Sequence, residues 1–413
     1  MRSSRRSEQP EQDDMSQIAS LAHGQAPTHT AASTPPRLAY IDHLRAALVI
    51  LVVLHHVAVV YGANTPDFYY QEPPDDDPLA ALVLSVVVLV NQAWFMGAFY
   101  LLAGYFTPGA YDRKGPGGFL TSRLIRLGIP LLVFIFVLNP LASIGYWLMP
   151  SSQSNPSVPL TWGAYPQLLG MGPMWFVVLL LIFNLGYVGW RWLMRHRAAR
   201  PKSQTAFPGY LAIVIFILGL AAASFLLRFF IPVNKTLFQF PTLAYLPQYL
   251  SFFILGTVAF RQDWLNQMPS SVGAAGLVAA LVTGVVLFPL AFSGHMFSME
   301  LSEAARNAFG NGHWESAVYT LWDSTFAVGL CLGLLVLFRR SFNGHSRLGS
   351  YLAQYGYTVY IIHIPILVFL AYTLRAISIG HLLKFGLVAA ILVPLSFSAA
   401  YFVRKIPGAD QVL

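Results

Sequence analysis

The chain has 413 residues, of which 56% are hydrophobic and only 10% are charged. About a quarter of the residues of a soluble domain are charged, so this composition excludes an ordinary soluble domain and indicates a membrane protein. The formal net charge of +8 does not indicate a nucleic-acid-binding protein, because the basic residues gather in alternate loops. The single cysteine, Cys331, excludes an intrachain disulfide and the cysteine spacings of zinc sites, so we expect no metal.

The domain organisation follows from the polarity of the chain. Residues 1–36 are polar and lack the apolar core of a signal peptide, which predicts a disordered cytoplasmic tail. Residues 37–405 are expected to form one transmembrane domain, and residues 406–413 a short C-terminal tail.

Ten apolar segments lie between the two tails, each long enough to cross a hydrocarbon core of about 30 Å as a helix. The sixth segment is the least regular, since Pro241 and Pro247 lie at its start and can break or kink a helix. The sequence therefore predicts an all-α, multispan helical membrane protein with about ten transmembrane helices. The segments are 38–61, 79–105, 127–149, 168–190, 208–230, 242–260, 271–293, 316–338, 352–374 and 380–402.

The distribution of basic residues predicts that both termini are cytoplasmic, because cytoplasmic loops carry the excess of Lys and Arg. With that orientation the N-terminal tail and the inner loops hold 19 of the 25 Lys and Arg residues, and the outer side holds five, among them Arg228. The remaining one, Arg45, lies inside the first segment. Residues 106–126 are then expected to form a basic inner loop rich in glycine and proline.

The first segment carries three ionisable residues in a pattern that indicates a functional site. Eleven residues are about three helical turns plus 20°, so Arg45 and His56 share one helix face, roughly 16 Å apart along the axis. Asp42 precedes Arg45 by three residues and can pair with it. Such groups inside a membrane are costly and normally face a protein interior or a wet cavity. The alternative is a structural Asp–Arg pair, with a histidine that bonds a neighbouring helix.

A second group of basic residues opens the third segment. Arg123 and Arg126 are spaced i and i+3 and share a helix face, and Arg113 and Lys114 precede them closely. Arginine binds phosphate bidentately, so an anionic cytosolic ligand can dock here. The alternative interpretation is that these residues are only the positive charges that cytoplasmic loops of membrane proteins usually carry.

Four further residues are possible supporting groups. Trp175 can line a cavity or belong to an interfacial aromatic belt. Tyr360 and His363 are spaced i and i+3, and a histidine within a span needs a partner. Asp323 can orient His56 or His363, as acids orient catalytic histidines, or it can anchor two helices.

Five of these motifs, in this order, resemble the membrane-bound acyltransferase family 3, which includes glycan O-acetyltransferases and glucan succinyltransferase-like proteins. The resemblance covers most of residues 37–405. The motifs that carry it are, in chain order, Arg45 with His56, FYLLAGYF ending the second segment, Arg123 with Arg126, GPMWFVVLLL and VYIIHIPIL. Ala103 and Tyr105 stand where serine and phenylalanine are common in the family.

The resemblance implies an acyl-CoA donor on the cytoplasmic side, with acetyl-CoA as the default, and an acceptor hydroxyl of an extracytoplasmic carbohydrate or another envelope or secreted compound. It implies that His56, Arg45 and Asp42 are catalytic and that Arg123, Arg126, Arg113 and Lys114 bind the donor. Partners are then acyl-CoA, the acceptor and the lipid bilayer of the cell membrane, with no nucleic acid. The rival interpretation is a transporter or exporter of a lipid-linked or glycan compound, in which these charges line a pathway.

Overall fold

The computed structural model describes residues 38–62, 68–73, 77–149, 159–195, 205–295, 301–344 and 346–413, so the expected tail 1–36 lies outside the described residues. From Ala39 onward the chain forms one compact unit. Nine helical stretches of the described residues are long and apolar enough to cross a membrane, and no strand longer than the isolated bridge between Leu237 and Phe240 occurs in them. The prediction of an all-α multispan membrane protein is confirmed.

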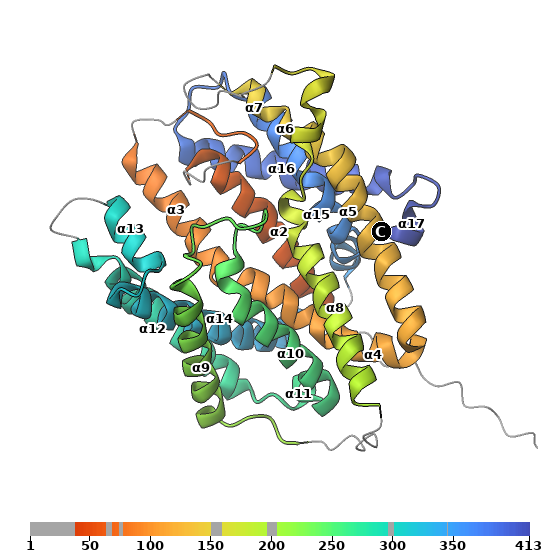
Figure 1. The fold of residues 1–413 in the computed structure, drawn as a ribbon, viewed down its shortest axis with the longest axis vertical. Coiled ribbons are helices and arrows are strands. Elements are labelled where there is room, and N and C mark those ends of the chain that lie inside the picture. The colour runs from red at the N-terminus through yellow and green to blue at the C-terminus, as the bar shows by residue number, and fades with distance from the viewer. Residues whose placement is uncertain are drawn as a thin grey trace, which may run out of the picture. The chain divides into compact units, whose positions relative to one another are not determined.

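The first half of the unit is built around α2 and a long interrupted helix (Figure 1). Its elements are α2 (Ala39–Tyr61), α3 (Pro78–Gln92), α4 (Phe95–Arg123), η1 (Leu124–Gly128), α5 (Ile129–Val133), η2 (Phe134–Leu138), α6 (Asn139–Ser143), α7 (Gly145–Leu148), η3 (Trp162–Leu168), η4 (Gly172–Met174), α8 (Trp175–Leu193) and α9 (Tyr210–Arg228). The elements η1 and η2 are π-helical.

The second half adds five long helices, α10, α12, α14, α15 and α16, and several short ones. Its elements are η5 (Leu243–Tyr245), α10 (Leu246–Gln262), α11 (Trp264–Gln267), α12 (Ser270–Ala291), η6 (Ser293–His295), α13 (Leu301–Phe309), α14 (Trp314–Ser341), α15 (Arg347–Thr373), α16 (His381–Val403) and α17 (Ala409–Val412).

Two of the ten expected segments fall within one continuous stretch, Pro78–Leu148, which is 71 residues long. The prediction that residues 106–126 form an inner loop is wrong. Helix α4 runs through most of this segment, to Arg123, and is interrupted only at Gly115. Gly115 has a φ of +68°, a left-handed conformation that glycine adopts without steric cost. At this break the orange ribbon turns back along the bundle (Figure 1), and Lys114 Nζ comes within 2.6 Å of Ser122 Oγ.

Two helix pairs pack at backbone contact because glycines face the partner helix. A Cβ on Gly104 of α4 would lie 2.1 Å from the carbonyl oxygen of Phe253 in α10, and one on Gly256 would meet the carbonyl oxygen of Leu101 at the same distance. Between α12 and α14, a Cβ on Gly276 would lie 2.6 Å from the carbonyl oxygen of Gly329, and a Cβ on Gly329 would lie 2.4 Å from that of Gly276. Small residues allow this close approach between membrane helices, where it favours association.

We expect Gly104→Val to lower the free energy of unfolding by about 1–3 kcal/mol, because the added side chain meets backbone atoms that have to shift. The effect is measured as a lower melting temperature of the purified protein in detergent. Gly219→Val in α9 is the matched control, because nothing lies within 4 Å of a Cβ there. Equal melting temperatures for the two variants would contradict the packing argument.

The core of the unit lies around α2, which contacts α15, α16 and α3. Buried valines of α2, including Val49, Val53 and Val57, pack against Ile364 and Leu367 of α15 in one hydrophobic cluster. Because α2 and α15 lie side by side, polar groups on the facing surfaces of these two helices come together.

Candidate functional site

The basic residues expected to bind the donor gather with Arg45 at the end of the unit where α2 begins. Arg123 is within electrostatic range of Arg45 and Arg126, and Lys114 is within range of Arg113, Arg123 and Arg126. We call these five residues the basic cluster. Tertiary structure therefore brings Arg45 and the donor-binding candidates into one cationic surface, which helix spacing alone could not show.

Within the basic cluster, two arginines have distinct environments. Arg45 Nη1 lies 3.5 Å from Asp42 Oδ1 and its side chain is half-exposed, so the expected pair exists and leaves the guanidinium accessible. Arg123 Cζ lies 5.1 Å from the ring centroid of Phe119, and its Nε is buried without a hydrogen-bond partner among the described residues. A buried N–H group is rarely left without an acceptor in proteins. The Arg123 Nε–H group can therefore donate a hydrogen bond to a bound anion.

The π-helix η1 gives Arg126 its position in the basic cluster. Tyr357 of α15 donates a hydrogen bond of 3.0 Å to the carbonyl oxygen of Arg126. In a π-helix the backbone carbonyls bond five residues ahead, and such segments often occur at functional sites. The same helix α15 thus contacts the basic cluster near its start and carries His363 farther along.

Deeper in the membrane unit, His56 of α2 meets His363 of α15. His363 Nε2 lies 3.1 Å from His56 Nδ1, and the two ring centroids are 5.0 Å apart. His363 is fully buried, whereas His56 is part-buried. The partner that each histidine requires inside a membrane is therefore the other histidine.

Backbone carbonyls assign the tautomers of this histidine pair. His363 Nδ1 lies 2.8 Å from the carbonyl oxygen of Tyr360 and 3.2 Å from that of Val359, so this nitrogen carries the proton. In a neutral ring Nε2 is then an acceptor, and His56 Nδ1 must be the donor to it. His56 Nδ1 also faces the carbonyl oxygen of Val52 at 2.9 Å, which favours the same tautomer. Nε2 of His56 is left as a lone-pair acceptor with no partner in the described part of the chain.

Aromatic residues enclose the histidine pair. The ring of Phe68 is stacked on the ring of His56 with 5.8 Å between centroids and 16° between planes. The ring of His55 is nearly perpendicular to that of His56, with 5.3 Å between their centroids. Tyr360 donates a hydrogen bond to the carbonyl oxygen of Pro173. The expected Tyr360–His363 element is therefore attached to the start of α8, and it holds α15 in place beside α2.

A polar contact from the segment 68–73, which precedes α3, lies close to this enclosure. Tyr69 donates a hydrogen bond of 2.5 Å to Asn139 Oδ1, and Asn139 Nδ2 donates one of 2.6 Å to the carbonyl oxygen of Leu168. Burial raises the pKa of Tyr69, so its hydroxyl keeps the proton that it donates. Gly172 approaches so closely that a Cβ there would lie 2.0 Å from the Tyr69 hydroxyl, and its φ of +42° suits glycine. Sequence reasoning missed Asn139, although an asparagine within an apolar segment was a signal.

Trp175 is buried and stacks on Tyr249 of α10 with 5.8 Å between ring centroids. The interpretation of Trp175 as an exposed residue of an interfacial aromatic belt is therefore not supported. Its neighbour Phe176, and not Trp175 itself, approaches the Tyr360–His363 element, with 6.2 Å between the ring centroids of Phe176 and Tyr360.

Asp323 does not orient either histidine. Its Oδ2 accepts a hydrogen bond of 2.6 Å from Arg228 Nη2, and its Oδ1 faces Ser324 Oγ. Arg228, which we expected among the outer charges, is 0% exposed and Asp323 is 2% exposed. The guanidinium also lies 4.8 Å from the ring of Tyr245. The interpretation of Asp323 as an anchor between two helices is the one that the structure supports.

Among the described residues no three His, Cys, Asp or Glu side chains lie close enough to hold a metal ion. The groups of the site are the imidazole of His56 with a free Nε2, the imidazole of His363 that positions it, and the basic cluster near the start of α2. A neutral imidazole so arranged can accept a proton from a hydroxyl that is placed against its free nitrogen.

This combination defines a multispan membrane protein with a histidine site between two helices and a cationic surface near the start of α2. The sequence model of the family described as the acyltransferase domain, acyltransferase family 3, matches residues 38–404. The chain therefore belongs to this family. The resemblance inferred from the five motifs is thereby confirmed.

Individual relatives match the chain weakly. The glucans biosynthesis protein C of Salmonella schwarzengrund (strain CVM19633) and that of Salmonella agona (strain SL483) are each 23% identical to this chain over 292 residues. The matched region is 67% of this chain and 70% of each relative. No solved structure matches the chain.

Proposed function

We propose that this protein is an integral membrane O-acyltransferase that moves an acyl group from cytoplasmic acyl-CoA to a hydroxyl of an extracytoplasmic carbohydrate or another envelope or secreted acceptor. Acetyl is the expected acyl group, and the bacterial cytoplasmic membrane is the expected location. The observation that carries the proposal is the histidine pair, in which His363 leaves Nε2 of His56 free to act as a base.

In the proposed reaction, His56 Nε2 takes the proton of the acceptor hydroxyl while the hydroxyl oxygen attacks the thioester carbonyl. The tetrahedral intermediate then collapses, the carbon–sulfur bond breaks, and the proton passes from His56 to the CoA thiolate. The products are an acyl ester and free CoA. No metal takes part in this sequence of steps.

The donor would lie along α2, with its phosphates at the basic cluster. Arg113, Lys114, Arg123 and Arg126 supply the positive charge, and arginine suits phosphate geometry. Since Arg45 lies in this cluster and roughly 16 Å from His56 along the helix, we assign to it the orientation of the donor rather than contact with the reacting carbonyl. Asp42 positions Arg45.

The name of the Salmonella relatives, glucans biosynthesis protein C, supports a glucan as the acceptor to test first. The experiment is to reconstitute the purified protein in proteoliposomes with acetyl-CoA labelled in the acetyl group and a glucan oligosaccharide. We expect free CoA and labelled glucan to appear in equal amounts. Transport of the glucan with acetyl-CoA intact would contradict the proposal, and label retained on the protein without acceptor would replace the general base by a covalent acyl-histidine.

Arg45→Lys tests the role of Arg45 in binding the donor. Lysine keeps the charge but lacks the planar fork that binds phosphate through two hydrogen bonds. We expect KM for acetyl-CoA to rise by about tenfold, the equivalent of about 1.4 kcal/mol, with kcat less affected. An unchanged KM for the donor would contradict this role.

His363→Phe tests the positioning of His56. Phenylalanine fills the space but cannot accept the hydrogen bond from His56 Nδ1, so the imidazole of His56 loses the contact that holds its tautomer. We expect kcat to fall by about 10–100-fold, as when an outer partner of a working histidine is removed, with KM for acetyl-CoA unchanged and a shifted pH–rate profile. A parental pH profile in a folded variant would contradict the positioning role.

A further inference from the structure

An apolar pocket of about 210 Å³ lies between α9, α10 and α14. Residues from all three helices line it, including Ala212 and Phe216 of α9, Phe252 of α10 and Leu332 of α14, and Trp264 of α11 lies at its edge. No charged, hydroxyl or amide side chain is among the lining residues. The proposed acyl transfer does not use this pocket.

The pocket persists because the helices on its two sides are held in separate pairs. Helix α10 is fixed to α4 through Gly104 and Gly256, and α14 is fixed to α12 through Gly276 and Gly329. Each pair is already at backbone contact, so α10 cannot approach α14 without leaving its own partner. The seam between the two pairs is therefore left open, with α9 beside it.

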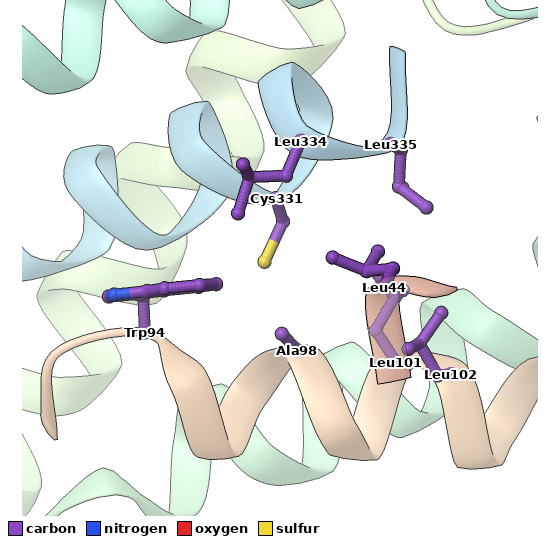
Figure 2. Close-up of a pocket in the computed structure, with 8 residues that line it drawn as sticks. All are labelled: Leu44, Trp94, Ala98, Leu101, Leu102, Cys331, Leu334 and Leu335. Atoms are coloured by element: carbon purple, nitrogen blue, oxygen red, sulfur yellow. The ribbon is translucent and has the colours of Figure 1, made fainter. Parts of the chain in front are cut away.

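Cys331 closes the inner side of the pocket. Figure 2 shows its sulfur pointing from α14 toward Trp94 and Ala98 of α4, with Leu44 of α2 beside them. The gap beyond the sulfur has a volume of only about 10 Å³, which is about one water molecule. Leu101 and Leu335 also line both the pocket and this small gap, so the three side chains together separate them.

Hydrocarbon is the only filling that suits these walls. Water in an apolar cavity finds no hydrogen-bond partners, and apolar cavities stay dry. An empty cavity forfeits the dispersion contacts of its lining atoms. The opposite face of α9 is strongly exposed, with Leu211 at 74% and Ile215 at 60%, as expected for a helix that faces lipid. Lipid chains are therefore present beside the opening of the pocket.

The polar end of the occupant is marked by Trp264. Its indole N–H is buried and has no partner in the described part of the chain, and indole rings are common where lipid chains meet their head groups. Arg339 donates hydrogen bonds of 2.8 and 2.6 Å to the carbonyl oxygens of Leu265 and Met268 at the same end. From the lining, the position and this polar edge, we infer that the pocket binds one hydrocarbon chain of a bilayer phospholipid, held between the α4–α10 and α12–α14 pairs.

The test is photocrosslinking in nanodiscs with a phosphatidylcholine that carries a diazirine midway along one acyl chain. We expect adducts, mapped by mass spectrometry, to concentrate on residues 207–216, 252–268 and 328–335. Ala212→Trp fills the pocket from α9 and is expected to lower these adducts several-fold. Ile215→Trp, on the exposed face of the same helix, is the matched control and should leave them unchanged.

Leu332→Phe fills the pocket from α14, so the test does not depend on the folding of one variant. Adducts spread evenly over all lipid-facing helices, or adducts that persist in both folded filling variants, would overturn the inference. It would equally be overturned if a diazirine-bearing long-chain acyl-CoA labelled the pocket while the phospholipid did not. Because the readout is lipid contact, its outcome is independent of whether the protein transfers acyl groups.

Discussion

His56→Ala is expected to lower the rate of acyl transfer by about 10²–10⁴-fold, because a positioned general base supplies an effect of that size. Nε2 of His56 is the acceptor that the contact with His363 leaves free, and no other imidazole contacts this pair except His55 within the described residues. The rate is measured as CoA release from acetyl-CoA in proteoliposomes containing equal amounts of folded protein.

His55→Ala is the matched control for this experiment. His55 is the adjacent residue, it is buried, and its ring lies 5.0 Å from that of Phe95, so its loss removes packing without removing the proposed base. We expect a far smaller fall in rate for this variant. Partial recovery of His56→Ala by added imidazole would further support the base. Near-parental turnover by His56→Ala would exclude it from catalysis.

Asp323→Ala is expected to lower the free energy of unfolding by about 3–5 kcal/mol, since it leaves a buried charge on Arg228 without its partner. The pair is 2.6 Å apart and both side chains are almost fully buried. Thermal unfolding in detergent and abundance in the membrane measure the effect. The double variant Arg228→Met with Asp323→Leu removes both charges and should recover most of the lost stability.

An exposed ion pair gives the matched control. Asp112 lies 2.5 Å from Arg261, but its side chain is 40% exposed, so Asp112→Ala should cost less than about 1 kcal/mol. Parental stability of Asp323→Ala, or a cost equal to that of Asp112→Ala, would show that the buried pair does not anchor α9 to α14.

The positions and order of the membrane segments could be read from hydropathy, because a helix that crosses a bilayer needs a long apolar run. Their number could not, since two of the ten expected segments belong to one of the nine stretches of the described residues. The inner loop 106–126 could not, since glycine and proline are typical of loops while α4 continues as a helix on both sides of Gly115. Membrane helices tolerate such residues when their neighbours satisfy the freed backbone groups.

The candidate residues of α2 were equally visible in the sequence. The periodicity of a helix places Arg45 and His56 on one face, and Asp42 was found beside Arg45 as expected. Their partners on other helices were not visible, because side-chain contacts between segments far apart in the chain have no local signal. The pairing of His56 with His363 and that of Asp323 with Arg228 are both of this kind.

By itself, the sequence determined the class of protein, its family and the residues whose burial in a membrane would be costly, since hydropathy and helical spacing are local properties. Tertiary structure decided which of those residues meet. The packing of α15 against α2 turns two isolated histidines into one site with a defined tautomer, and the packing of α9 against α14 removes Asp323 from that site. The physical reason is that each buried polar group takes the nearest partner that the helix packing offers, and helix packing depends on the whole set of contacts.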